Sequence, residues 1–238
     1  MTLQTRYSVQ THVGLKRKVN EDAVLALPES DIWLVSDGMG GHAAGDYASR
    51  LIADLTAGIP VDLVPGDRLH ALRETIQEAH RLIRAEATSR GIEVIGATVV
   101  GLILADGHFA ALWAGDSRLY RLRDGEIEML TTDHSVVAAL VQNGQMTWDE
   151  AEKHPQSNAI TRAVGVGDTL ELDKIRGDIL PGDRFLICSD GLTKYATFDM
   201  LEHALSTQPI ELICDHLIQI ALAGGGADNI TTAVVDVI

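Results

Sequence analysis

Aspartate stands beside glycine, or at the end of an apolar stretch, at several widely separated places in this sequence. The pattern is clearest at Asp37, which follows the apolar residues 32–35, and at Asp190, which follows the apolar residues 185–188. Alone, an Asp-Gly pair indicates only a turn. The acidic signatures of the chain are Asn20-Glu21-Asp22, Asp37-Gly38-Met39-Gly40-Gly41-His42, Gly115-Asp116-Ser117-Arg118, Ser189-Asp190-Gly191 and Asp228-Asn229.

Carboxylates at the ends of strands are suited to binding a divalent cation. Mg²⁺ and Mn²⁺ prefer oxygen ligands, and a strand end holds such a ligand rigidly. Clustered carboxylates raise one another's pKa unless a cation lies between them. A glycine directly after the aspartate, as at Gly38, lets the backbone carbonyl come close to the ion. We therefore expect these aspartates to converge on Mn²⁺ or Mg²⁺.

Short stretches that are apolar or alternating, and that end at turn residues, predict the strands of the fold. Asp106-Gly107 and Asp124-Gly125 are typical of tight hairpins, so we expect the strands beside them to be antiparallel. The predicted strands are residues 5–12, 23–27, 32–36, 94–105, 108–114, 119–123, 127–130, 170–176, 184–188 and 231–237.

Apolar residues at helical spacing predict two helices that lie on a sheet, at residues 44–56 and 68–89. Thr147 and Glu150 have the spacing of a capping box, which predicts a short helix after residue 147. Because each sheet must bury its apolar face, we predict an α+β fold: a four-layer α-β-β-α sandwich of two antiparallel sheets flanked by helices. Further helices are predicted at residues 136–142, 199–205 and 210–223.

Length and composition favour one folded domain over residues 1–238 and exclude several classes of protein. The chain is 46% hydrophobic and has 34 acidic against 19 basic residues, a formal net charge of −15. This excess of acid disfavours binding to nucleic acid or to an anionic membrane. We find neither a signal peptide nor a membrane-spanning stretch, so we expect a cytoplasmic protein. Cys188 and Cys214 lack zinc-site spacing and are expected to be buried thiols.

The order of these motifs resembles the type 2C family of metal-dependent protein phosphatases, in its compact bacterial form. The resemblance covers essentially the whole chain. It rests on Gly14-Leu15-Lys16-Arg17, Asn20-Glu21-Asp22, the run at 37–42, Gly96-Ala97-Thr98, Gly115-Asp116-Ser117-Arg118, Thr132-Asp133-His134-Ser135, Thr161-Arg162-Ala163-Val164-Gly165, Ser189-Asp190-Gly191 and Asp228-Asn229-Ile230-Thr231.

The resemblance implies a pair of tightly bound Mn²⁺ or Mg²⁺ ions and a weaker third one. Asp37 is expected to bridge the pair. Asp190 and Asp228 would complete the site of one ion, and the carbonyl of Gly38 would bind the other. Asp116, with help from Asp190, would hold the third ion.

The resemblance also implies roles for residues around the ions. Glu21 and Asp22 are expected to act mainly through metal-bound waters, and Asn229 to hydrogen-bond such a water. Arg17 matches the phosphate-binding arginine, and its guanidinium fork suits two phosphoryl oxygens. For His42 two roles stay open, the general acid for the leaving oxygen or a structural loop histidine, because Met39-Gly40-Gly41 separates it from the Asp-Gly pair.

By this resemblance the chain is expected to be a protein serine/threonine phosphatase. Water activated by the metal pair would attack phosphoserine or phosphothreonine directly. Phosphorylated proteins and a cognate serine/threonine kinase would be its partners, the chain would be a monomer, and residues 142–165 would form a flap that influences substrate choice. Two alternatives stay open: a phosphoprotein-binding pseudophosphatase, and a regulatory phosphatase with one partner protein.

Overall fold

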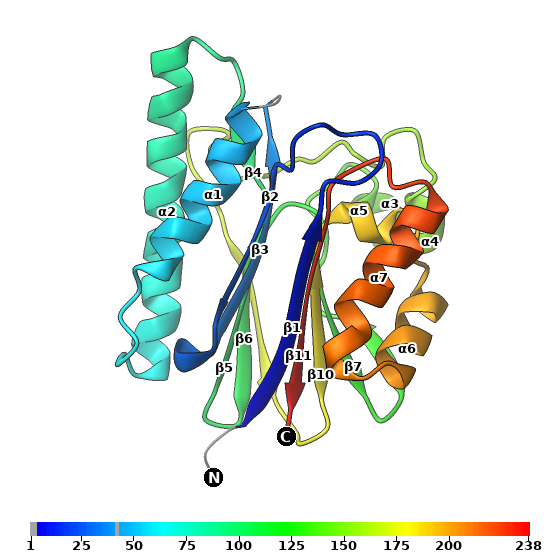
Figure 1. The fold of residues 1–238 in the computed structure, drawn as a ribbon. Helices are drawn as coiled ribbons and strands as arrows, with labels where there is room; N and C mark the ends of the chain where they lie inside the picture. The colour runs from blue at the N-terminus through cyan, green and yellow to red at the C-terminus, as the bar shows by residue number, and fades with distance from the viewer. Residues whose placement is uncertain (1–3, 41–42) are drawn as a thin grey trace.

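The computed structural model describes residues 4–40 and 43–238 as a sandwich of four layers. Two sheets pack face to face, and helices cover the outer face of each sheet, as Figure 1 shows. Neighbouring strands in both sheets are antiparallel. The predicted fold class is therefore confirmed.

The two sheets are assembled from strands that are far apart in the sequence. The first sheet runs, in spatial order, β1 (Thr5–His12), β11 (Ile230–Val237), β10 (Arg184–Cys188), β7 (Arg118–Arg123) and β8 (Glu126–Met129). The second runs β2 (Asp22–Leu27), β3 (Ile32–Met39), β5 (Val99–Ala105), β6 (His108–Ala114) and β9 (Asp173–Asp178), with β4 (Gly96–Ala97) paired to β3.

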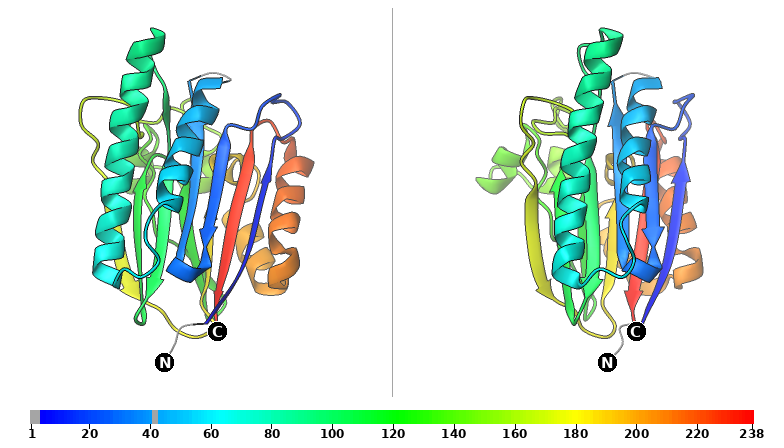
Figure 2. Two further views of the ribbon diagram at one scale, coloured as in Figure 1. Left: turned by 60° about the vertical axis from the view of Figure 1, so that its left-hand side comes forward. Right: turned by 90° about the vertical axis from the view of Figure 1, so that its left-hand side faces the viewer.

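Long amphipathic helices cover both sheets. In the views of Figure 2, α1 (Ala43–Ala57) and α2 (Pro65–Arg90) lie over the second sheet. On the other side, α6 (Phe198–Thr207) and α7 (Ile210–Gly224) lie over the first sheet. The short helices are η1 (Pro28–Ser30), α3 (Ala138–Gln142), α4 (Trp148–Ala151) and α5 (Asp190–Thr193). No helix within residues 4–40 and 43–238 is long and apolar enough to cross a membrane.

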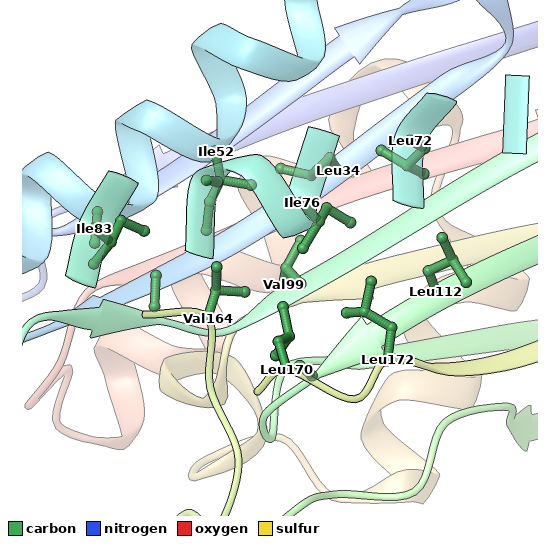
Figure 3. Close-up of a cluster of buried hydrophobic side chains, with 14 of the residues drawn as sticks. Leu34, Ile52, Leu72, Ile76, Ile83, Val99, Leu112, Val164, Leu170 and Leu172 are labelled. Atoms are coloured by element: carbon green, nitrogen blue, oxygen red, sulfur yellow. The ribbon is translucent and has the colours of Figure 1, made fainter. Parts of the chain in front are cut away.

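Three apolar cores hold the four layers together, one at each boundary between layers. In the core between α2 and the second sheet, Ile76 and Ile83 face Val99 and Val164, as Figure 3 shows. A second core fills the space between the sheets, and a third lies under α6 and α7. Burial on both sheet faces leaves the strand ends and their loops as the place where polar side chains can gather.

The hairpin predictions are confirmed by the backbone. Asp106 and Gly107 have φ of 51° and 77°, and Asp124 and Gly125 have 53° and 86°. Positive φ at both central residues is the geometry that a two-residue hairpin requires.

Three predicted strands differ from the observed ones by more than one residue at an end. The stretch 32–36 continues to Met39, so Asp37 lies inside β3. The stretch 94–105 is interrupted at Thr98, which separates β4 from β5. The stretch 170–176 becomes a strand only at Asp173, which pairs with Trp113, the residue before the last of β6. Leu170 precedes the strand and packs into the core under α2, as Figure 3 shows.

Candidate active site

Asp37 is fixed near the end of β3 by backbone hydrogen bonds. Its amide donates to the hydroxyl of Thr98 at 3.0 Å, and its carbonyl accepts from the amide of Thr98 at 2.8 Å. The same hydroxyl lies 2.7 Å from that of Ser117. The break between β4 and β5 therefore serves to hold Asp37, which lies within β3 and directly opposite Asp22 of β2.

Gly38 must be glycine because two other segments approach its backbone. A Cβ built there would lie 2.2 Å from the carbonyl oxygen of Gly45 in α1 and 2.5 Å from that of Glu21. The amide of Gly38 donates to the carbonyl of Glu21 at 3.0 Å. Any side chain would force α1 or the Glu21 segment away from the pocket that Asp37 and Gly38 line.

The first sheet contributes Asp190 and Asp228 at the ends of two neighbouring strands. Asp190 begins α5 two residues after β10, and Asp228 lies just before β11. A Cβ at Gly191 would lie 1.9 Å from the carbonyl oxygen of Asn229, so glycine lets the two segments touch. The ammonium of Lys194 lies 2.7 Å from Oδ2 of Asp190 and 3.2 Å from Oδ2 of Asp228.

Arg17 reaches one of these carboxylates, that of Asp228, from the loop between β1 and β2. Its Nε and Nη2 donate to the two oxygens of Asp228, each at 2.9 Å. Burial acts to raise the pKa of Asp228, but the Arg17 hydrogen bonds and the charges of Lys194 and Arg17 hold that pKa below its usual value. The guanidinium is half exposed and so can meet a ligand that enters the pocket.

The predicted site residues meet around one pocket of about 330 Å³. Burial, followed by repulsion between the carboxylates, raises the pKa of Asp37 and of Asp116 well above the usual range and that of Asp22 to about 7. Asp22 lies behind the pocket, where the hydroxyl of Ser189 donates to its Oδ2 at 2.8 Å. The predicted residues that line the pocket are Arg17, Glu21, Asp37, Gly38, Asp116, Asp190, Asp228 and Asn229.

The donor set fits hard divalent cations. Oδ1 of Asp22 and Oδ1 of Asp190 are buried and have no hydrogen-bond partner in the part of the chain that the structure describes. Leaving such atoms unpaired is costly, and a cation at the centre of the carboxylates would satisfy them and offset their repulsion. As the side chains stand in that part of the chain, no group of three or more His, Cys, Asp or Glu residues is arranged to hold a metal ion. Lys194 and Arg17 occupy some of the carboxylate oxygens instead.

A family model described as "Protein phosphatase 2C" matches residues 12–219, which is most of the chain. The chain belongs to the protein phosphatase 2C family. It is of the compact bacterial type that the sequence motifs resemble, and the family is metal-dependent.

Relatives and solved structures agree with this membership. The chain is 36% identical to the serine/threonine protein phosphatase PstP of Mycobacterium tuberculosis over 100% of its own length and 46% of that protein, so it spans about half of this relative. It is 35% identical to the serine/threonine phosphatase stp of Listeria monocytogenes, covering 95% of the chain and 94% of the relative.

Two solved structures share both fold and sequence with the chain. PppA, described as a regulatory component of the type VI secretion system in Pseudomonas aeruginosa, matches with a TM-score of 0.92 and 44% identity over 98% of each chain. The catalytic domain of PstP, solved in complex with two manganese ions, matches with a TM-score of 0.90 and 35% identity over 100% of each chain.

Within this phosphatase 2C site, Asn229 has a structural role that the sequence does not predict. Its amide nitrogen donates to the carbonyls of Val13 and Val19, and its Oδ1 accepts from the amide of Glu21 at 2.8 Å. Both donor hydrogens therefore go to the backbone, and Asn229 ties the loop that carries Arg17 to the first sheet. A water could reach only the remaining lone pair of Oδ1. His42 lies outside the described residues.

Sequence reasoning missed three residues that this phosphatase 2C site uses. Thr98 holds Asp37, Lys194 lies between two carboxylates, and Glu152 pairs with Arg118. Thr98 stands in one of the motifs of the resemblance, which gave it no role. For Lys194 a signal existed, because a lysine four residues after Asp190 can turn back onto it within one helical turn. The other contacts join segments whose meeting no local pattern reports.

Proposed function

We propose that this chain is a protein serine/threonine phosphatase that hydrolyses phosphoserine and phosphothreonine in proteins by direct attack of water. The observation that carries the proposal is the meeting of Asp37, Asp116, Asp190 and Asp228, with Arg17 beside them, around one pocket of a phosphatase 2C fold. The solved PstP domain with two manganese ions supports Mn²⁺ or Mg²⁺ as the cofactor.

The proposed metal ligands come from both sheets. Asp37 would bridge two ions, with Asp190 and Asp228 on one of them and the carbonyl of Gly38 on the other. When bound, the ions supply Lewis-acid activation of water and offset negative charge. Oδ1 of Asp190 is buried and unpaired in the described part of the chain, which supports it as a ligand of one ion.

Other acidic residues are proposed to support this pair of ions. Glu21 and Asp22 orient water around it, and Asp116 with Asp190 holds a weaker third ion. The burial of Asp116 and its repulsion with Asp190, which raise its pKa, support a cation between them.

The guanidinium of Arg17 hydrogen-bonds to two oxygens of the phosphoryl group. The water oxygen bonds to phosphorus and gives up a proton, while the bond from phosphorus to the serine or threonine oxygen breaks and that oxygen takes up a proton. We propose His42 as the donor of that proton. Because the attack is direct, no phosphorylated enzyme forms.

We also propose the form in which the chain acts, where it acts and on which proteins. The chain would act as one catalytic domain and as a monomer, with residues 142–165 as a flap, in the cytoplasm and against the targets of a serine/threonine kinase. The match to the serine/threonine protein phosphatase PstP supports phosphoproteins as the substrate class.

The decisive test is release of phosphate from a phosphothreonine peptide with and without Mn²⁺. We expect turnover that rises with Mn²⁺ and is lost with a chelator. A chain that binds the peptide but releases no phosphate at any Mn²⁺ or Mg²⁺ concentration would instead be a pseudophosphatase. A panel of unrelated phosphopeptides then separates a broad phosphatase from one that serves a single partner.

A further inference from the structure

Arg118, the first residue of β7, joins two acidic residues from different parts of the chain. Its side chain is only 5% exposed, and its Nη2 lies 2.7 Å from Oδ2 of Asp133 and 2.7 Å from Oε1 of Glu152. Its Nε donates to both oxygens of Asp133. The guanidinium also lies 4.8 Å from the centre of the Trp148 ring, a cation–π distance. Trp148 and Glu152 belong to segment 142–165, the proposed flap.

This contact attaches the middle of the flap, while backbone pairing attaches its far end. The amide of Thr161 donates to the carbonyl of His134 at 2.7 Å, and Val164 pairs with Ala97 beside β4. Around α4, a capping box between Thr147 and Glu150 keeps the helix formed. The capping box acts only within the flap, so it does not fix where α4 lies on the body of the protein.

The Arg118 contact lies next to the pocket carboxylates. Arg118, Glu152, Asp116 and Asp190 line one small cavity of about 10 Å³ together with Asn158 of the flap. Asn158 also lines the main pocket. A change in how Glu152 is held would therefore move a flap residue that borders the pocket.

We propose that Arg118 is the docking point of the flap: by holding Glu152 and Trp148 against Asp133, it sets the position of the flap over the pocket and so the binding of a phosphoprotein segment. The inference rests on the proposed function for its substrate. Arg118, Glu152 and Trp148 are positioning residues here, because none of them lines the main pocket.

The test uses flap variants, since removing Arg118 would leave the buried carboxylate of Asp133 uncompensated and endanger the fold. Glu152→Gln keeps the size of the side chain and removes its charge, and Trp148→Leu removes the ring. Lys153→Gln is the matched control, because Lys153 is an exposed flap neighbour without an ion pair among the described residues. Melting temperatures first establish that each variant is folded.

Two measurements then report separately on how firmly the flap is held and on the reaction. In the full chain, we expect hydrogen exchange of the amides at 148–158 to become about tenfold faster in Glu152→Gln and in Trp148→Leu, and to stay unchanged in Lys153→Gln. We expect KM for a phosphothreonine peptide to rise about fivefold in both variants, while kcat/KM for p-nitrophenyl phosphate changes less than about twofold. The double variant should lose less than the sum of the single losses, since both act through Arg118.

Unchanged exchange in Glu152→Gln would overturn the docking point, whatever the activity. An equal loss on the peptide and on p-nitrophenyl phosphate would also overturn it, because the residue would then act on the reaction centre and not on the flap. The exchange measurement needs no turnover, so a failure of the proposed function, seen as an inactive wild-type chain, remains distinguishable from a failure of this inference.

Discussion

Two neighbouring cations each lie between a pair of carboxylates, but only one pair faces the pocket. Lys194 contacts one oxygen of Asp190 and one of Asp228, and the other oxygen of Asp190 is buried and unpaired within the described residues. Arg118, by contrast, contacts both oxygens of its partner Asp133. The first arrangement leaves capacity for a further cation, and the second leaves none.

The difference distinguishes a ligand-binding site from a structural support. Around Arg118, Asp133 is buried and Glu152 is mostly buried, each of them is paired, and the guanidinium face is covered by Trp148. A satisfied buried network of this kind fixes geometry. The carboxylates around Lys194 are incompletely satisfied, and such groups in a pocket mark a place where a ligand acts.

The largest effect is expected at Asp37, which should lie at the centre of the incompletely satisfied cluster. Asp37→Asn removes a ligand charge without opening a cavity, so we expect kcat to fall at least about 10³-fold while the melting temperature of the metal-free protein stays the same or rises. Hydrolysis of p-nitrophenyl phosphate over a Mn²⁺ titration, with circular dichroism on the same samples, measures both. Full activity at saturating Mn²⁺ would remove Asp37 from the site.

The satisfied cluster should respond in stability instead. Arg118→Met leaves the carboxylates of Asp133 and Glu152 buried without their cation, and we expect the free energy of unfolding to fall by about 3 kcal/mol. Urea unfolding followed by fluorescence measures the loss, with Arg121→Met, a partly exposed neighbour in β7, as control. Because no pocket carboxylate is freed, added Mn²⁺ should not restore the loss. Restoration by Mn²⁺ would show that the two clusters are not distinct.

The two clusters also show which features could be predicted from the sequence and which could not. Periodicity and turn residues predict most strands and the long helices, because those patterns report contacts within an element. The aspartates were predictable because each lies beside glycine or near the end of a predicted strand. The pairing of Glu152 with Arg118 was not, since it depends on how α4 and the turn after it pack against β7. The short helix at Asp190, which places Lys194, is too brief for a periodic signal.

A smaller effect is expected at Arg17, the second cation on Asp228. It is half exposed and lies at the edge of the pocket, so its loss should cost phosphate binding more than turnover. For Arg17→Ala we expect KM for a phosphothreonine peptide to rise about tenfold with kcat changed less than about threefold. Arg17→Lys should recover only part of the affinity, because an ammonium cannot make the two parallel hydrogen bonds. An unchanged KM would argue against its role.

Lys194→Met is the counterpart of Arg118→Met and should have the smallest effect. In the metal-free protein, the loss of the ammonium leaves Asp190 and Asp228 to repel each other, and we expect about 1 kcal/mol lower stability. Mn²⁺ can take over the same carboxylates, so the melting temperatures of wild type and variant should converge as Mn²⁺ is added. Calorimetric scans in chelator and in rising Mn²⁺ measure this. If the gap between the two proteins stays constant at saturating Mn²⁺, the carboxylates around Lys194 are not where the ion binds, and they would be a closed support like those around Arg118.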